Sequence, residues 1–149
     1  MLSVPNTYSE WVAVLDQLKL KQDDDSVLRV MMQGKIEWHS GVAERFAKKL
    51  TDVVNHRMNA ASDKFQKDMS RAYGQEGAIV QALLALRKEM SFLAKAISVP
   101  AIPEKDRQHY HRLVLEQADA MQTSLEDSAK SDRSGKLASI VRNHRINAF

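Results

Sequence analysis

The longest regular pattern of apolar side chains runs from residue 40 to residue 73. Its apolar positions recur every three or four residues, the spacing of one face of an α-helix. They are Val42, Phe46, Leu50, Val53 or Val54, Met58 (or the stem of Arg57), Ala61, Phe65 and Met69. Ser40 suits the N-terminal cap, and Tyr73-Gly74 suits the end. The pattern therefore predicts a helix about 50 Å long.

A second apolar pattern, over residues 76–97, is the most regular in the chain. Its apolar residues are spaced 4, 3, 4, 3 and 4 apart, at Ile79, Leu83, Leu86, Met90, Leu93 and Ile97. This is the a/d seam of helices that pack knobs into holes. Val80, Leu84 and Phe92 widen the stripe, which favours a globular bundle over an isolated coiled coil. Pro100 and Pro103 are expected to end this helix.

A third long helix is predicted from Pro103 to about residue 130. Pro103, followed by Glu104 and Asp106, suits a first helical turn. The apolar stripe is expected at Tyr110, Leu113 or Val114, Gln117, Met121, Leu125 (or Ser124) and Ala129. Only short connections separate the three long segments, so successive helices should fold back on each other.

Shorter helices are predicted at both ends of the chain. Thr7 and Glu10 have the spacing of a capping box, and Trp11 and Leu18 follow at helical spacing. The Asp23–Asp25 cluster suits the start of a second helix, which Gly34 would end. After Gly135 comes an amphipathic piece that contains Leu137, Ile140 and Val141. Residues 143–149 are expected to fray unless Ile146 or Phe149 docks.

These patterns together predict an all-α fold, because no segment has the alternation of a strand. The predicted architecture is an antiparallel helical bundle of three long helices with short N-terminal and C-terminal accessory helices. We expect a single helical domain over residues 1–149, of which 130–149 form a basic, partly flexible C-terminal segment.

The unequal lengths of the long helices leave part of the first one without a cover. At 1.5 Å per residue the three span about 51, 33 and 40 Å. The second helix would then end opposite residue 52, leaving Val42, Phe46 and Leu50 uncovered. The N-terminal pair of helices could cover them with Trp11, Leu15, Leu18 and Leu28. The alternative is a second protomer, which would make the protein a homo-oligomer.

Composition narrows the classes of protein to consider. The 149 residues are 44% hydrophobic and 28% charged, which is ordinary for a globular domain. The absence of cysteine excludes disulfides, thiolate catalysis and Cys-ligated zinc. No apolar run approaches the roughly 18 residues of a membrane span, and no signal peptide pattern is visible. We therefore expect no membrane span and a cytoplasmic location.

No motif for catalysis or for a cofactor is present. The five histidines form neither a His-Glu-x-x-His motif nor the Glu-x-x-His pairs of a di-iron bundle. The Gly-x-Ser-x-Gly elbow and the glycine-rich phosphate loops are also missing. We accordingly expect no catalytic residue, no metal and no cofactor, and a protein that is not an enzyme. An enzyme or small-ligand binder with its site in the bundle core is the third alternative.

The net charge of +3 hides an asymmetry along the chain. Residues 104–129 carry three basic and six acidic side chains, whereas residues 130–149 carry five basic and one acidic. A basic terminus can contact nucleic acid phosphates, although it is also an ordinary solvated end. The candidate phosphate contacts are Arg133, Lys136, Arg142 and Arg145, with Arg142 and Arg145 on one helix face. Further basic residues lie on the first long helix, at Lys48, Lys49, Lys64, Lys67 and Arg71.

The leading functional hypothesis follows largely by elimination. It is a non-enzymatic protein-interaction module, namely an adaptor, regulator or assembly factor that binds a protein partner through a helical surface. Trp38 would either staple its junction to the first turn of the long helix or anchor an interface. The candidate interface residues are Trp38, Val42, Phe46, Leu50, Leu137, Ile140 and Val141. Nucleic-acid binding through the basic residues is the runner-up.

Overall fold

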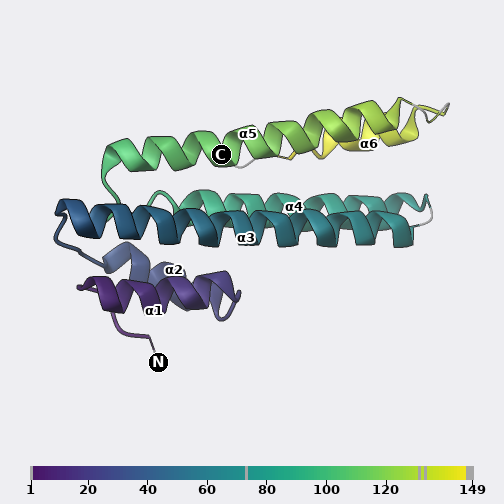
Figure 1. Ribbon diagram of the computed structural model, residues 1–149. Helices are drawn as coiled ribbons and strands as arrows, with labels where there is room; N and C mark the ends of the chain where they lie inside the picture. Colours follow the sequence, from purple (N-terminus) through teal and green to yellow (C-terminus); the bar gives the residue numbers. More distant parts are fainter. Residues whose placement is uncertain (1, 73, 131, 133, 147–149) are drawn as a thin grey trace. The chain divides into compact units, whose positions relative to one another are not determined.

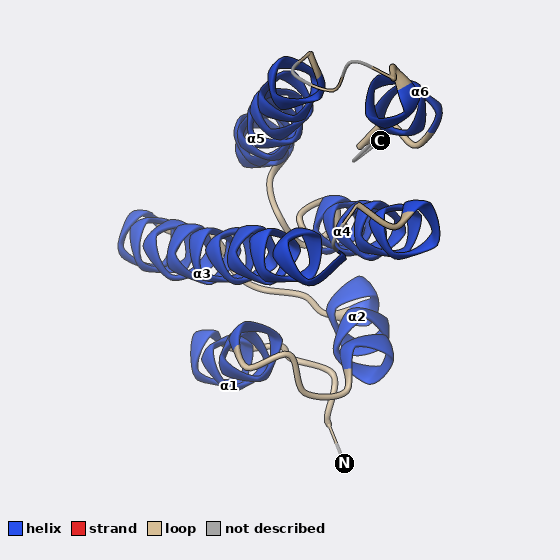
Figure 2. Cartoon of the chain, turned by 90° about the vertical axis from the view of Figure 1, so that its right-hand side faces the viewer, coloured by secondary structure: helices blue, strands red, loops and turns tan. Residues whose placement is uncertain are grey.

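The computed structural model describes residues 2–72, 74–130, 132 and 134–146, and all regular elements among them are α-helices (Figures 1 and 2). In chain order they are α1 (Tyr8–Lys19), α2 (Asp24–Gln33), α3 (Ser40–Ala72), α4 (Glu76–Ala96), α5 (Glu104–Ala129) and α6 (Lys136–Asn143). The predicted all-α class is thus confirmed for the described residues. None of these helices is long and apolar enough to cross a membrane.

The ends of the helices follow from local chemistry. The Thr7 hydroxyl accepts the Glu10 N–H at 3.3 Å and donates to the Glu10 carboxylate at 3.0 Å, so α1 begins with the predicted side-chain cap. Pro103 precedes α5, and its carbonyl accepts the Arg107 N–H at 2.9 Å. Beyond α3, Gly74 has a φ of +76°, a left-handed conformation that suits glycine. The predicted end at Tyr73 lies outside the described residues.

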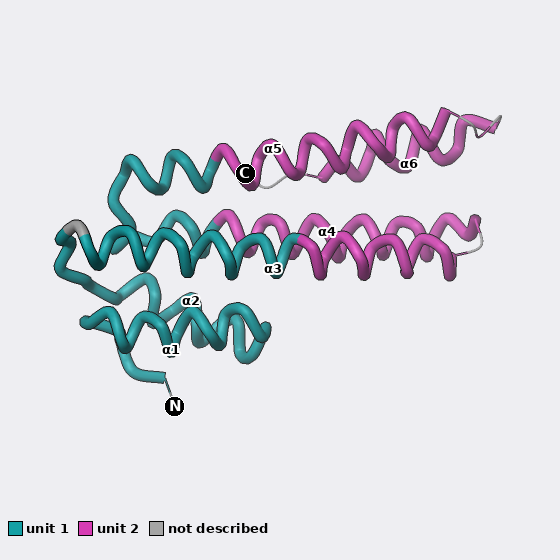
Figure 3. The backbone as a smooth tube through the Cα atoms, in the orientation of Figure 1, with its two compact units in different colours: residues 1–58, 95–111 teal, residues 59–94, 112–149 magenta. Residues whose placement is uncertain are grey.

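Two compact units make up the structure (Figure 3). Unit 1 consists of residues 1–58 and 95–111, and unit 2 of residues 59–94 and 112–149. Unit 1 holds α1, α2, the first half of α3 and the start of α5. Unit 2 holds the rest of α3, most of α4, the rest of α5 and α6.

The core of unit 1 forms where α1 meets α3. Trp11 and Leu15 of α1 are fully buried, as are Phe46 (2% exposed) and Leu50 (0%) of α3. The Trp11 and Phe46 rings meet edge to face with centroids 5.5 Å apart. At the rim of this contact, Lys19 donates to Asp52 at 2.9 Å. The prediction that the N-terminal helices cover this part of α3 is confirmed, so no second protomer is needed to bury it.

An ion pair between a buried arginine and a half-buried aspartate joins the first three helices of unit 1. Arg57 is 2% exposed, and its guanidinium donates to both carboxylate oxygens of Asp24 at 2.9 Å. It also donates to the Leu18 carbonyl at 3.1 Å. One arginine of α3 therefore contacts both α1 and α2. The apolar pattern places only its stem on the buried face and does not indicate the pair.

Gly34 follows α2 as predicted, but it does not have the left-handed conformation in which glycine commonly ends a helix. Its φ is −68°, which any residue can adopt. A Cβ at this position would lie 2.5 Å from the Trp11 ring and 3.0 Å from Pro5 Cγ. The Trp11 indole N–H donates to the Lys35 carbonyl at 3.0 Å, which keeps the ring beside the backbone. Gly34 is required because the indole packs directly against the chain.

Two aromatic residues of unit 1 join separate segments of the chain. Trp38 joins the junction before α3 to the loop before α5, and Tyr110 joins α5 to α3. Trp38 is half-buried, meets Phe46 edge to face at 5.1 Å, and donates its indole N–H to the Ala101 carbonyl at 2.8 Å. Tyr110 donates its hydroxyl to the Ala47 carbonyl at 2.9 Å, and burial raises its pKa. Of the two alternatives for Trp38, the staple agrees with these contacts, although it reaches the second turn of α3 rather than the first.

The buried stripe of α5 is shifted from the predicted one. Its buried side chains are Tyr110, Val114, Ala118, Gln122 and Ala129. Gln117 is exposed and Met121 only half-buried, so the prediction was wrong by one position in the middle of the helix. Leu84 of α4, predicted to widen the apolar stripe, is 40% exposed. The shift matters because it brings a polar side chain into the core of unit 2.

Candidate functional site

The seven candidate interface residues fall into two groups. Trp38, Val42, Phe46 and Leu50 belong to unit 1, and the other three, Leu137, Ile140 and Val141, belong to unit 2. Of these four residues of unit 1, only Trp38 and Val42 keep part of their side-chain surface exposed to solvent, because α1 covers the rest of the stripe. Phe46 and Leu50 are therefore core residues, which corrects the expectation that they offer an exposed surface.

In unit 2 the three candidate residues lie on α6 and pack against other helices of the same unit. Ile140 is buried in a cluster with Ala72 of α3 and with Ile79 and Leu83 of α4. Half-buried apolar side chains surround this cluster, namely Phe65, Met69, Ala78, Val80, Leu125 and Leu137. Val141 is fully buried. The apolar face of α6 is thus inserted into unit 2 rather than presented to solvent.

Asp132 and Ser134 hold the N-terminus of α6. The Asp132 carboxylate accepts the Leu137 N–H at 2.9 Å, and the Ser134 N–H and hydroxyl at 3.2 and 2.9 Å. The Ser134 hydroxyl oxygen accepts the Lys136 N–H at 3.3 Å. These bonds, that of Leu137 above all, lower the pKa of Asp132 below its ordinary value of 3.8. They satisfy N–H groups that a helix start leaves without partners.

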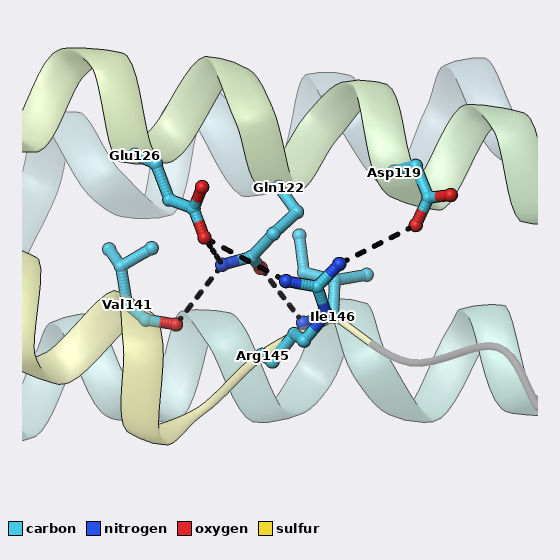
Figure 4. A network of polar contacts seen from close by, with 6 residues as sticks. All are labelled: Asp119, Gln122, Glu126, Val141, Arg145 and Ile146. Carbon is cyan, nitrogen blue, oxygen red and sulfur yellow. Dashed lines mark hydrogen bonds and ion pairs between the residues drawn. The ribbon is translucent and has the colours of Figure 1, made fainter.

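A buried glutamine of α5 contacts the last turns of α6 and the residues just after it (Figure 4). Gln122 is 1% exposed, and its amide nitrogen donates to the Val141 carbonyl at 3.3 Å and to the Glu126 carboxylate at 3.0 Å. Its amide oxygen accepts the Ile146 N–H at 3.0 Å. Ile146 is buried, so the condition under which this segment was not expected to fray is met. Phe149, the other residue named in that condition, lies outside the described residues.

The basic residues near the C-terminus have different surroundings. Lys136 and Arg142 are exposed on α6, and Arg133 lies outside the described residues. Arg145 lies 3.7 Å from the Asp119 carboxylate and 3.8 Å from that of Glu126 (Figure 4). The prediction that Arg142 and Arg145 share a helix face is wrong, because α6 ends at Asn143. One of the four candidate phosphate contacts is therefore already paired with acidic side chains of α5.

We call the surface of unit 2 that receives residues 136–146 the α6 site. It has an apolar part and a polar edge, the latter entirely on α5. The apolar part consists of Phe65, Met69, Ile79, Leu83 and Leu125, and the polar edge of Asp119, Gln122 and Glu126. Leu137, Ile140 and Val141 supply the apolar side of the docked helix, and Arg145 supplies the charge that faces the edge. Such an arrangement binds an amphipathic helix.

The basic residues of α3 do not form an uninterrupted positive patch. In unit 1, Lys48 is exposed and Lys49 pairs with Asp16. In unit 2, Lys64 donates to Asp68 at 2.7 Å. Two open grooves of about 390 and 420 Å³ run along this part of α3 and share Arg71. The smaller is lined by Asp63, Gln66, Lys67, Ser70 and Arg71, and the larger by Lys64, Asp68, Arg71, Ala72, Ala78, Gln81, Ala82 and Ala85. Acidic side chains therefore alternate with the basic ones at both grooves.

Within the described part of the chain, no three His, Asp or Glu side chains gather in a way that could hold a metal ion. No protein-family model matches the chain, and comparison with curated proteins and with solved structures finds no similar protein or fold.

Proposed function

We propose that this protein is a non-enzymatic protein-interaction module, an adaptor, regulator or assembly factor, that binds a protein partner through a helical surface of unit 2. The observation that carries the proposal is the seating of α6. Its Ile140 side chain lies in one buried cluster with residues of α3 and α4. A surface that accommodates one amphipathic helix has the chemistry to accommodate another, which is a common way for proteins to recognise helices.

The proposal includes the finer predictions made from the sequence. It takes α3, α4 and α5 as the three long helices of an antiparallel bundle, within one domain and with the other helices as accessories. It keeps the cytoplasm as the expected location. Self-association stays an alternative that light scattering can measure.

Nucleic-acid binding ranks second because several of the basic residues already pair with carboxylates. Arg145, Lys49 and Lys64 each lie against a carboxylate. Exposed Lys136 and Arg142 keep the alternative open for the end of the chain. Binding through phosphates falls by orders of magnitude between about 50 and 200 mM salt, so the salt dependence separates the two functions.

Affinity capture with matched variants of the full chain tests the proposal. Leu125→Asp introduces a charge beside the apolar cluster, whereas Thr123→Asp introduces the same charge on the exposed side of α5. We expect one protein to be captured by the wild type and by Thr123→Asp but not by Leu125→Asp. After purification it should bind the wild-type chain with a saturating isotherm.

Two results would refute this function. One is that no captured protein binds the wild-type chain once purified. The other is that capture depends on nucleic acid, so that nuclease treatment abolishes it, or that both variants capture equally. Circular dichroism of the two variants shows whether each keeps its helices.

A further inference from the structure

The α6 site has an acidic edge that faces a basic residue of its occupant. Asp119 and Glu126 of α5 both lie within 4 Å of Arg145, and neither carboxylate is buried. The whole stretch of residues 104–129 has six acidic and three basic side chains, whereas residues 130–149 have one acidic and five basic. The charge of the site is thus complementary to a basic residue that follows the occupant's helix.

The apolar contacts of the occupant are equally specific in their spacing. Leu137, Ile140 and Val141 stand at positions i, i+3 and i+4, which is the anchor pattern of a helix that lies in a groove. The exposed side of the same helix carries Lys136, Ser139 and Arg142. The site therefore fits a helix with one aliphatic face that is followed, two residues after its end, by a basic side chain.

The present occupant has the properties of a segment that can leave. α6 has only eight residues, and isolated helices shorter than about 12–15 residues are marginal in water. Besides its apolar face, Asp132 and Ser134 hold it at its start, and Gln122 and the ion pairs of Arg145 hold it at its end. Release would expose the half-buried Phe65, Met69 and Leu125 together with the cluster they surround.

From these observations we propose that the α6 site binds an amphipathic helix of a partner protein that is followed by a basic residue, and that α6 is its intramolecular competitor. The inference rests on the proposed function and specifies the chemistry of the partner. A partner helix would place aliphatic residues where Leu137, Ile140 and Val141 lie, and a basic residue opposite Asp119 and Glu126. The protein would then bind such a helix only as α6 leaves the site.

A fluorescent peptide with the sequence of residues 134–146, added to the full chain, tests the proposal. Val141→Asp in the chain disfavours docking of its own α6, because a charge would replace a fully buried side chain. Ser139→Asp is the matched control on the exposed side of α6. We expect the peptide to bind the Val141→Asp chain at least tenfold more tightly than the wild type or the Ser139→Asp chain.

Changes in the peptide report on the two features of the occupant. A peptide that itself carries Val141→Asp, or a scrambled peptide of the same composition, should not bind. A peptide with Arg145→Glu should bind about two- to fivefold more weakly, the size of an exposed ion pair. Arg145→Glu in the chain is a milder way to weaken α6, and should raise binding of the unmodified peptide by a similar factor.

The proposal is overturned if the peptide binds wild type and variants with equal affinity, or if the scrambled peptide binds as well. It is also overturned if the peptide binds neither the Val141→Asp chain, shown to be helical by circular dichroism, nor the Arg145→Glu chain. These outcomes concern only the chemistry of the occupant. A purified partner that binds the chain without displacing this peptide would leave the proposed function intact and refute the competition.

Discussion

Replacing Gln122 by alanine should loosen the end of the chain while leaving α5 intact. The side chain makes three hydrogen bonds, to the Val141 carbonyl, the Ile146 N–H and the Glu126 carboxylate. Alanine removes all three hydrogen bonds and leaves the Val141 carbonyl and the Ile146 N–H without this partner. Alanine also favours the helical conformation of α5, so the damage should be confined to the docked segment.

The magnitude follows from the two backbone groups. A buried polar group that loses its partner costs about 1–3 kcal/mol, and water entering the vacated space would reduce that cost. We therefore expect Gln122→Ala to destabilise the docking of residues 136–146 by about 2–4 kcal/mol. At 1.4 kcal/mol per factor of ten, this corresponds to roughly a 30- to 700-fold change in the docking equilibrium.

Amide hydrogen exchange of the full chain measures this change residue by residue. The Ile146 amide and the amides of α6 should exchange faster in Gln122→Ala by that factor, whereas amides of α1 should be unaffected. Gln117→Ala is the matched control, because Gln117 is an exposed glutamine of the same helix. Equal exchange of the α6 amides in the two variants would refute the role of Gln122.

Three further predictions concern other parts of the chain. Gly34→Ala should destabilise unit 1 by about 1–3 kcal/mol in urea unfolding, because its Cβ would overlap the indole, whereas Gly41→Ala, with nothing within 4 Å, should not destabilise it. Asp24→Asn should lower stability by about 1–3 kcal/mol, because a neutral amide replaces the carboxylate that pairs with the buried Arg57 guanidinium, and exposed Asp25→Asn should have little effect. The pKa of Asp132 is lowered in the folded protein, so its contribution to the α6 start is present above the unfolded value near 3.8 and is lost as the pH falls through the lower folded pKa. Amide exchange, corrected for the pH dependence of the intrinsic rate, should show weaker protection of α6 at pH 3 than at pH 5.

The lengths of the long helices could be predicted because the chain marks their ends chemically. Gly74 lies between the end of α3 and the start of α4, and Pro100 and Pro103 lie between the end of α4 and the start of α5. The regular seam along α4 likewise predicts its buried residues, since Ile79, Leu83 and Leu93 are all buried. Periodicity could also show that Phe46 and Leu50 need a cover, and the N-terminal helices were one of the two candidates for it.

The α6 site could be predicted only in part. The apolar face of α6 is visible in the sequence, but its receptor is assembled from residues as distant as Phe65 and Leu125. Gln122 escaped detection because the apolar pattern of α5 fits two stripes one residue apart, and a polar residue counts against the correct one. Arg145 was expected on the helix but lies after it, because no glycine or proline marks the end of α6 at Asn143.

The most direct test of this account is a methyl NOE spectrum of the full wild-type chain. The central claim is that α6 is seated in unit 2 by its apolar face. The account predicts cross-peaks between the methyl groups of Ile140 and those of Ile79 and Leu83, which belong to the same buried cluster. Absence of these cross-peaks, together with random-coil chemical shifts for residues 136–146, would contradict it.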